Sequence, residues 1–188
     1  MNHEPTRSKL FETQLRAYTE GTIEQINDQW IFFDGETEEA IRMEDFLQQE
    51  VEVFRLNRWK KGILAETGIL EVGKDRILLR DHDQIRVRKQ LIYSLEMLLN
   101  SINEDAFFQF VTTLNSLKFS VYDCLYCYNH LSFLSDDQRK DGVNFMVFDN
   151  QDAICNVQHH FYYFEKTSDR FEFTLNTGKR LIIEKLIS

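Results

Sequence analysis

The residues of this chain with the clearest chemical potential are three cysteines and a histidine. Cys124 and Cys127 form a Cys-x-x-Cys pair, and Cys155 and His159 follow in a later segment. Thiol and imidazole groups are the ligands that zinc prefers, so these four side chains can be drawn as one tetrahedral metal site. The alternative is structural, because a free cysteine often packs in a core as a small apolar residue. The chain has no second Cys-x-x-Cys pair, so we favour the structural interpretation and expect no cofactor.

A second candidate site is a basic block inside an acidic chain. The net charge is −9, yet residues 55–89 hold ten Lys or Arg and only five Asp or Glu. Cations beside an aromatic side chain are typical of surfaces that bind anionic partners, nucleic acids included. Two alternatives stay open: the block balances acidic residues of the chain or of another subunit, or its cations protect strand edges. The candidate partner-binding residues are Arg55, Arg58, Trp59, Lys60 and Lys61.

No catalytic residues can be named from the sequence. The chain contains no Gly-x-Gly-x-x-Gly, Walker, Gly-x-Ser-x-Gly or His-Glu-x-x-His motif. We therefore favour a non-enzymatic interaction or regulatory protein whose basic, Trp-containing face meets an anionic partner. The alternatives are a nucleic-acid-binding module that uses the same face, and a metal-binding protein.

The elements that must position these residues change in type along the chain. From residue 14 to 88, apolar residues recur with period two between turn residues such as Asn27-Asp28 and Gly73-Lys74-Asp75. Five or so short strands with tight turns predict a small antiparallel β-barrel or a rolled sheet, and we favour the barrel. Residues 1–88 are accordingly expected to form the first domain.

Residues 89–188 are expected to form a second domain, of α+β type. A period of 3.6 predicts three helices between residues 89 and 134, with Asn103 as the N-cap of the second and the third near 121–134. From residue 143 onward, four strands joined by short turns predict an antiparallel meander. The predicted fold class is therefore α+β: a small antiparallel barrel, then three helices, then a four-stranded meander.

One predicted strand, 153–164, carries aromatic side chains on both faces. The helices can cover one face only, so the second needs either the N-terminal barrel or another copy of the chain. The sequence therefore favours a protein partner or a homodimer.

The first 14 residues lack the apolar stretch of a signal peptide, and no apolar run is long enough to span a membrane. Three cysteines without a secretory signal indicate reduced thiols in the cytoplasm. The stretch from Trp59 to Leu64, WKKGIL, followed by Gly68 to Val72, GILEV, resembles an uncharacterised protein family of Bacillus-type Gram-positive bacteria. That resemblance implies a cytoplasmic location and assigns no activity.

Overall fold

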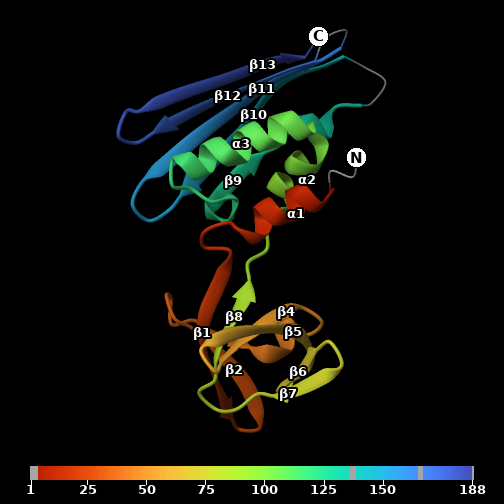
Figure 1. Cartoon of the computed structure of the whole chain (residues 1–188). Coiled ribbons are helices and arrows are strands. Elements are labelled where there is room, and N and C mark those ends of the chain that lie inside the picture. Colours follow the sequence, from red (N-terminus) through yellow and green to blue (C-terminus); the bar gives the residue numbers. More distant parts are fainter. Residues whose placement is uncertain (1–3, 136–138, 165–166, 188) are drawn as a thin grey trace. The chain divides into compact units, whose positions relative to one another are not determined.

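The computed structural model describes residues 4–135, 139–164 and 167–187 and divides the chain into two compact units (Figure 1). One unit is Tyr18–Lys89, and the other combines Met1–Ala17 with Gln90–Ser188. Each unit has its own cluster of buried apolar side chains. The segment Tyr18–Lys89 is thus inserted into the other unit, between that unit's first and second helices.

The unit Tyr18–Lys89 is an antiparallel sheet of eight described strands. They are β1 (Tyr18–Ile26), β2 (Gln29–Asp34), β3 (Ala40–Arg42), β4 (Glu50–Arg55), β5 (Arg58–Glu66), β6 (Ile69–Val72), β7 (Asp75–Leu78) and β8 (Gln84–Arg88), with a 3-10 turn η1 (Met43–Phe46) after β3. Their order in the sheet is β3-β2-β1-β8-β4-β5-β6-β7. Because β3 and β7 end the sheet without pairing to each other, the predicted closed barrel is wrong.

A side chain, rather than strand pairing, brings distant parts of this sheet together. The indole of Trp30 on β2 packs against Gly68 in the turn between β5 and β6, where a Cβ atom would lie 2.7 Å from the indole nitrogen. Gly68 also has a φ of +85°, which other residues adopt only with strain. The edge strands β3 and β7 have three and four residues, too few to form an extended ladder between them.

The other unit packs helices against a five-stranded antiparallel sheet. The helices are α1 (Glu4–Glu12), α2 (Tyr93–Ser101) and α3 (Glu104–Ser116); the strands are β9 (Cys124–Tyr128), β10 (Lys140–Asp149), β11 (Ile154–Tyr163), β12 (Thr167–Leu175) and β13 (Arg180–Ile187), with 3-10 turns η2 (Val121–Asp123) and η3 (His130–Phe133). The sheet order is β13-β12-β11-β10-β9, and Figure 1 shows α2 and α3 over one face. The predicted four-stranded meander is wrong, because β9 pairs with β10 as a fifth strand.

The predicted third helix at 121–134 is also wrong. Ser120 and Asp123 form a capping box, but it closes only the single turn η2, and β9 begins at Cys124. A β-bulge in the pairing of β9 with β10 falls between Val147 and Phe148. The bulge shifts the alternation, so the buried residues Cys124 and Cys127 lie three positions apart, a spacing that imitates a helix.

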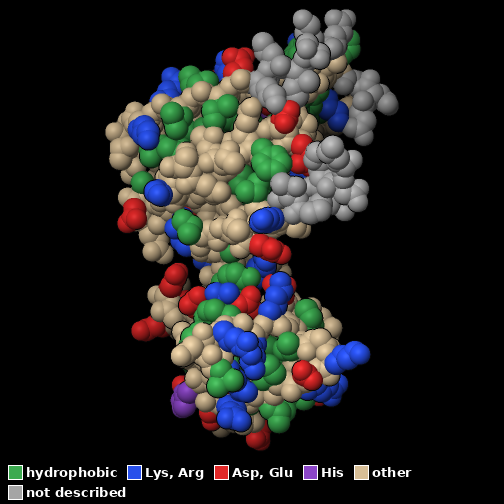
Figure 2. Space-filling view, in the orientation of Figure 1, with side chains coloured by type: hydrophobic (Ala, Val, Ile, Leu, Met, Phe, Trp, Pro, Cys, Tyr) green, Lys and Arg blue, Asp and Glu red, His purple; other side chains and the backbone are tan. Residues whose placement is uncertain are grey.

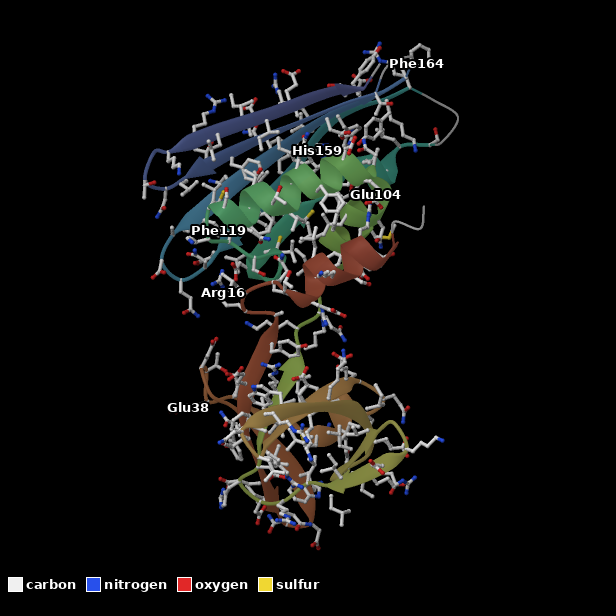
Figure 3. All side chains as sticks on the ribbon, in the orientation of Figure 1. Arg16, Glu38, Glu104, Phe119, His159 and Phe164 are labelled. Atoms are coloured by element: carbon white, nitrogen blue, oxygen red, sulfur yellow. The ribbon has the colours of Figure 1, made fainter. Side chains whose placement is uncertain are left out.

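Helix α1 was not predicted, because the sequence analysis assigned its residues to the barrel domain. Arg7 attaches α1 to the corner between α2 and α3 by donating to the carbonyls of Leu99 at 2.7 Å and Ile102 at 3.0 Å. Its Nε also donates at 2.7 Å to Glu104, which is labelled in Figure 3, and its guanidinium lies 4.4 Å from the ring centroid of Phe107. One arginine therefore satisfies carbonyl groups at the end of α2 and an acidic residue at the start of α3.

A buried carboxylate joins α3 to the sheet. Asp169 on β12 is buried and accepts hydrogen bonds from the Asn103 amide at 2.8 Å and the Tyr163 hydroxyl at 2.5 Å. His159, which is labelled in Figure 3, has its Nε2 2.7 Å from the same Asp169 oxygen that Tyr163 contacts. The other end of the Asn103 side chain accepts from the Ala106 N–H at 2.9 Å, which confirms Asn103 as the N-cap of α3.

The hydrogen-bond pattern around His159 is that of the neutral Nε2–H tautomer. The Asn144 carbonyl oxygen accepts from the Leu131 N–H, so the Asn144 amide nitrogen donates to His159 Nδ1 at 3.1 Å. The His159 ring stacks on Phe171 with centroids 4.4 Å apart. Burial and then the charge of Asp169 hold the pKa of Tyr163 well above its usual range, which keeps its hydroxyl a donor.

We expect Asn103→Ala to lower the free energy of unfolding by about 2–4 kcal/mol. The loss combines the helix cap, about 1 kcal/mol, with one missing donor to a buried carboxylate, about 1–3 kcal/mol. Asn103→Ser is the matched control, because serine can still cap the helix but cannot reach Asp169. Urea unfolding monitored by circular dichroism should rank wild type above Asn103→Ser and Asn103→Ser above Asn103→Ala; equal stability of all three would contradict the bridging role.

Candidate functional site

Arg86, in the middle of β8, lies between two aromatic rings. Its guanidinium is 4.2 Å from the ring centroid of Tyr18 and 4.4 Å from that of Trp59. Its Nε donates at 2.8 Å to an oxygen of Glu52, a buried residue, and its Nη2 lies 2.6 Å from the same oxygen. Burial and then the Glu52 charge raise the pKa of Tyr18. The cation of Arg86 thus compensates a buried carboxylate, and one face of Trp59 is occupied within the unit.

Two of the five predicted partner-binding residues already have acidic partners. Arg55 forms an ion pair with Asp83 and donates to the carbonyl of Leu78 at 2.8 Å. Lys61 Nζ lies 2.7 Å from Glu50, and this contact raises the pKa of Lys61. Part of the positive charge in residues 55–89 is therefore balanced inside the same unit.

The remaining predicted cations lie on the β4–β5 hairpin. Arg58 is exposed and Lys60 is half-buried, and neither forms an ion pair with a residue that the structure describes. Trp59, between them, packs against Phe54 with ring centroids 5.1 Å apart. Figure 2 shows Lys and Arg side chains gathered on the visible face of this unit, with hydrophobic side chains beside them.

The tip of this hairpin holds a residue that does not suit its backbone. Leu56 and Asn57 form the two-residue turn, with φ of +53° and +58°. Such turns favour Asn-Gly, because glycine and asparagine tolerate positive φ at lower cost than a branched side chain. Leu56 is also 84 % exposed, the largest fraction among the large hydrophobic residues that the structure describes. An exposed leucine in a strained turn gives no packing benefit to the fold, which makes it a candidate contact residue.

Further apolar side chains extend this tip into a surface. The hydrogen bond from Arg55 to Leu78 ties the hairpin to the end of β7, and Leu78 is itself exposed. Phe54 and Trp59 are paired with each other on the opposite face of the hairpin from Arg58 and Lys60, so their rings do not belong to this group. We call this group the hairpin surface; its members are Leu56, Arg58, Lys60 and Leu78.

The sequence pattern identified Arg58 and Lys60 of the hairpin surface but not its apolar members. The alternation of residues 50–56 placed Leu56 at the end of a strand and gave no sign of exposure. One signal was available: the pair Leu56-Asn57 separates two alternating runs at the spacing of a two-residue hairpin turn, where a leucine is unusual. Asp83 was also missed as the partner of Arg55, since only the fold brings them together.

The predicted metal ligands lie on different strands of the five-stranded sheet. Cys124 and Cys127 are on β9, and Cys155 and His159 are on β11, with β10 between these two strands. Within residues 4–135, 139–164 and 167–187, no group of three or more His, Cys, Asp or Glu is arranged to hold a metal ion. His159 is instead hydrogen-bonded to Asn144 and Asp169. The four residues do not meet as one site, and metal binding by them stays a prediction.

Comparisons with known proteins agree with the resemblance noted in the sequence. A family model described as "Protein of unknown function (DUF2777)" matches residues 5–185. The chain is 33 % identical over 179 residues to "Uncharacterized protein YisN" of Bacillus subtilis (strain 168), covering 94 % of this chain and 90 % of that protein. No solved structure matches. The predicted likeness to an uncharacterised Bacillus-type family is thereby confirmed.

Across the described parts of the chain, none of the helices has both the length and the apolar character needed to cross a membrane.

We expect Arg86→Lys to lower the free energy of unfolding by about 1–3 kcal/mol, because lysine keeps the charge but lacks the planar guanidinium that fits between Tyr18 and Trp59. Arg76→Lys is the control, since the Arg76–Glu71 pair is exposed and should change stability by less than about 0.5 kcal/mol. Thermal and urea unfolding measure the stability of both variants. Equal losses for the two substitutions would show that the position of Arg86 between the two rings adds no stability beyond that of an exposed ion pair.

The three thiols should react slowly in the native protein. Burial raises the pKa of Cys124 to about 12 and those of Cys127 and Cys155 to about 11, so little reactive thiolate is present at pH 8. Labelling with a chromogenic disulfide reagent should be at least ~100-fold slower in buffer than in guanidinium chloride. A thiol that is labelled within minutes in buffer would contradict this and favour the metal-binding alternative for that residue.

Proposed function

The chain belongs to the DUF2777 family, whose function is unknown, and on that premise we propose that it is a non-enzymatic, cytoplasmic interaction protein whose hairpin surface binds an acidic segment of a partner protein. The observation that carries the proposal is Leu56, an exposed leucine in a left-handed turn beside the cation Arg58.

The composition of the hairpin surface favours a protein partner. Interface cores are enriched in aromatic residues and arginine, and their binding energy is concentrated in a few such side chains. Leu56 and Leu78 offer exposed apolar anchors, and Arg58 and Lys60 supply positive charge for carboxylates. The matching ligand is an extended segment in which acidic residues alternate with leucine or another large apolar residue.

A nucleic acid is the second candidate, because Phe54 and Trp59 are aromatic side chains beside cations. Two features weigh against it. Arg86 already covers one face of Trp59, and Arg55 and Lys61 are paired with acidic residues. A phosphate backbone would meet chiefly Arg58 and Lys60, too few contacts for tight binding through charge alone.

The test uses the full chain and a fluorescein-labelled peptide of alternating Glu and Leu. We expect Leu56→Asn to weaken peptide binding at least ~5-fold, about 1 kcal/mol, while the melting temperature stays equal or rises, because asparagine fits the turn better. Arg58→Glu should abolish binding at low salt, whereas Lys74→Glu, a charge reversal in the β6–β7 turn, should leave it unchanged.

Two results would contradict the proposal. One is peptide binding by Leu56→Asn that equals wild type. The other is the absence of any peptide binding by wild type at low ionic strength. Tighter binding of a single-stranded oligonucleotide than of the peptide, falling steeply with salt, would favour the nucleic-acid alternative instead.

A further inference from the structure

The five-stranded sheet has a second face that the helices do not cover. Cys155, Val157, His159 and Phe161 of β11 point into the core beneath the helices, so the residues between them point to the opposite face. On that opposite face, β9 and the middle of β10, Phe145 and Val147, are apolar, and Asp141 and Asp149 lie toward the two ends of β10. The exposed aromatic residues of this apolar part, together called the aromatic strip, are Tyr126, Tyr128, Phe133 and Phe145.

The aromatic strip is continuous along the sheet. Phe145 of β10 is paired directly with Tyr128 of β9, and Val147 is paired with Tyr126. The Tyr128 ring stacks on Phe133 of η3 with centroids 6.1 Å apart and an interplanar angle of 24°. Strand pairing and ring stacking thus hold these side chains in a fixed, pre-organised surface.

The strip is large enough to matter for association. The exposed fractions of Tyr126, Tyr128, Phe133 and Phe145 are 54 %, 41 %, 74 % and 46 %. At about 200 Å² per aromatic residue, they leave about 400 Å² of surface exposed on one copy. Two copies would bury about 800 Å² from these side chains alone, and neighbouring residues would bring the total to the ~1,200 Å² typical of the smaller specific interfaces.

The part of the same face formed by β12 and β13 carries charged side chains of both signs. On β12 and β13 it carries two arginines and two glutamates: Arg170, Arg180, Glu172 and Glu184. Glu172 forms ion pairs with both arginines, and Arg180, Arg170 and His160 together lower its pKa. With equal numbers of both charges, the β12–β13 part of the face can meet a rotated copy of itself without net repulsion, and it offers no net attraction to a strongly acidic or basic partner.

We propose that this sheet face binds a second copy of the chain, forming a two-fold dimer in which the two aromatic strips pack against each other. Twisted sheets pack face to face when their contact surfaces are apolar. Homodimer interfaces are also more apolar than transient ones, which suits the four exposed aromatic side chains of the strip. The two-fold arrangement is the commonest closed symmetry for such a self-complementary surface.

Sedimentation velocity of the full chain between ~1 and ~100 µM tests the dimer. We expect wild type to dimerise in this range and Phe145→Arg, in the strip, to weaken dimerisation at least ~10-fold. Ile26→Arg on β1 is the control. The exposed fraction of Ile26, 43 %, is similar to the 46 % of Phe145, but Ile26 belongs to the other unit, so its substitution should leave the dimer intact. Should Phe145→Arg fail to fold, the double variant Tyr126→Ser/Tyr128→Ser takes its place in the test. It only removes ring area from the strip and should also weaken dimerisation.

Salt separates this proposal from the function proposed for the hairpin surface. Each chain carries −9, so raising NaCl from ~50 to ~500 mM screens repulsion between copies and should preserve or strengthen the dimer. The same change should weaken peptide binding at the hairpin surface. A wild-type monomer at 100 µM would overturn the dimer, as would a dimer that persists in both strip variants, and neither result bears on the peptide.

Discussion

The carboxylate of Asp169 is the constraint on which the helix-containing unit depends. A buried charge without a cation beside it is tolerated only when donors surround it, and here three donors come from two separate elements. Asn103 belongs to the start of α3, whereas His159 and Tyr163 belong to β11. The position of the helix, the tautomer of the histidine and the protonation of the tyrosine are therefore coupled: altering one leaves another without its partner.

The inserted unit also buries a carboxylate, but there a cation lies beside it. Glu52 is buried on the sheet, and Arg86 covers it while lying between Tyr18 and Trp59. Neighbouring pairs, Arg55 with Asp83 and Lys61 with Glu50, take up more of the positive charge. The cations left at the β4–β5 hairpin stand out for this reason, together with a leucine that the turn geometry does not favour.

The sequence predicted correctly those elements whose signals are local and regular, and it failed where the local pattern was interrupted. The cap at Asn103 and the stripe that follows it predicted α3 correctly, because capping and periodicity are local. The helix expected at 121–134 failed where a bulge gave β9 a helix-like spacing. Whether the sheet closes into a barrel depends on contacts between distant segments, so no local pattern could reveal it. The exposure of Leu56 had one local signal, the position of the pair Leu56-Asn57 between two alternating runs. The basic residues of the candidate surface were identifiable by type, but which of them had acidic partners was not.

The insertion of Tyr18–Lys89 also bears on the order in which the chain can fold. During synthesis α1 emerges before the inserted unit, whereas α2 and α3, which α1 contacts, emerge after it. Strand β1 pairs with β8 from Tyr18 opposite Arg88 onward, so folding of the inserted unit brings its two ends together. That pairing replaces a loop of about seventy residues with a short connection and lowers the entropic cost of docking α1 by on the order of 2 kcal/mol. The folded inserted unit would thereby keep α1 close in space to α2 and α3, which are synthesised after it.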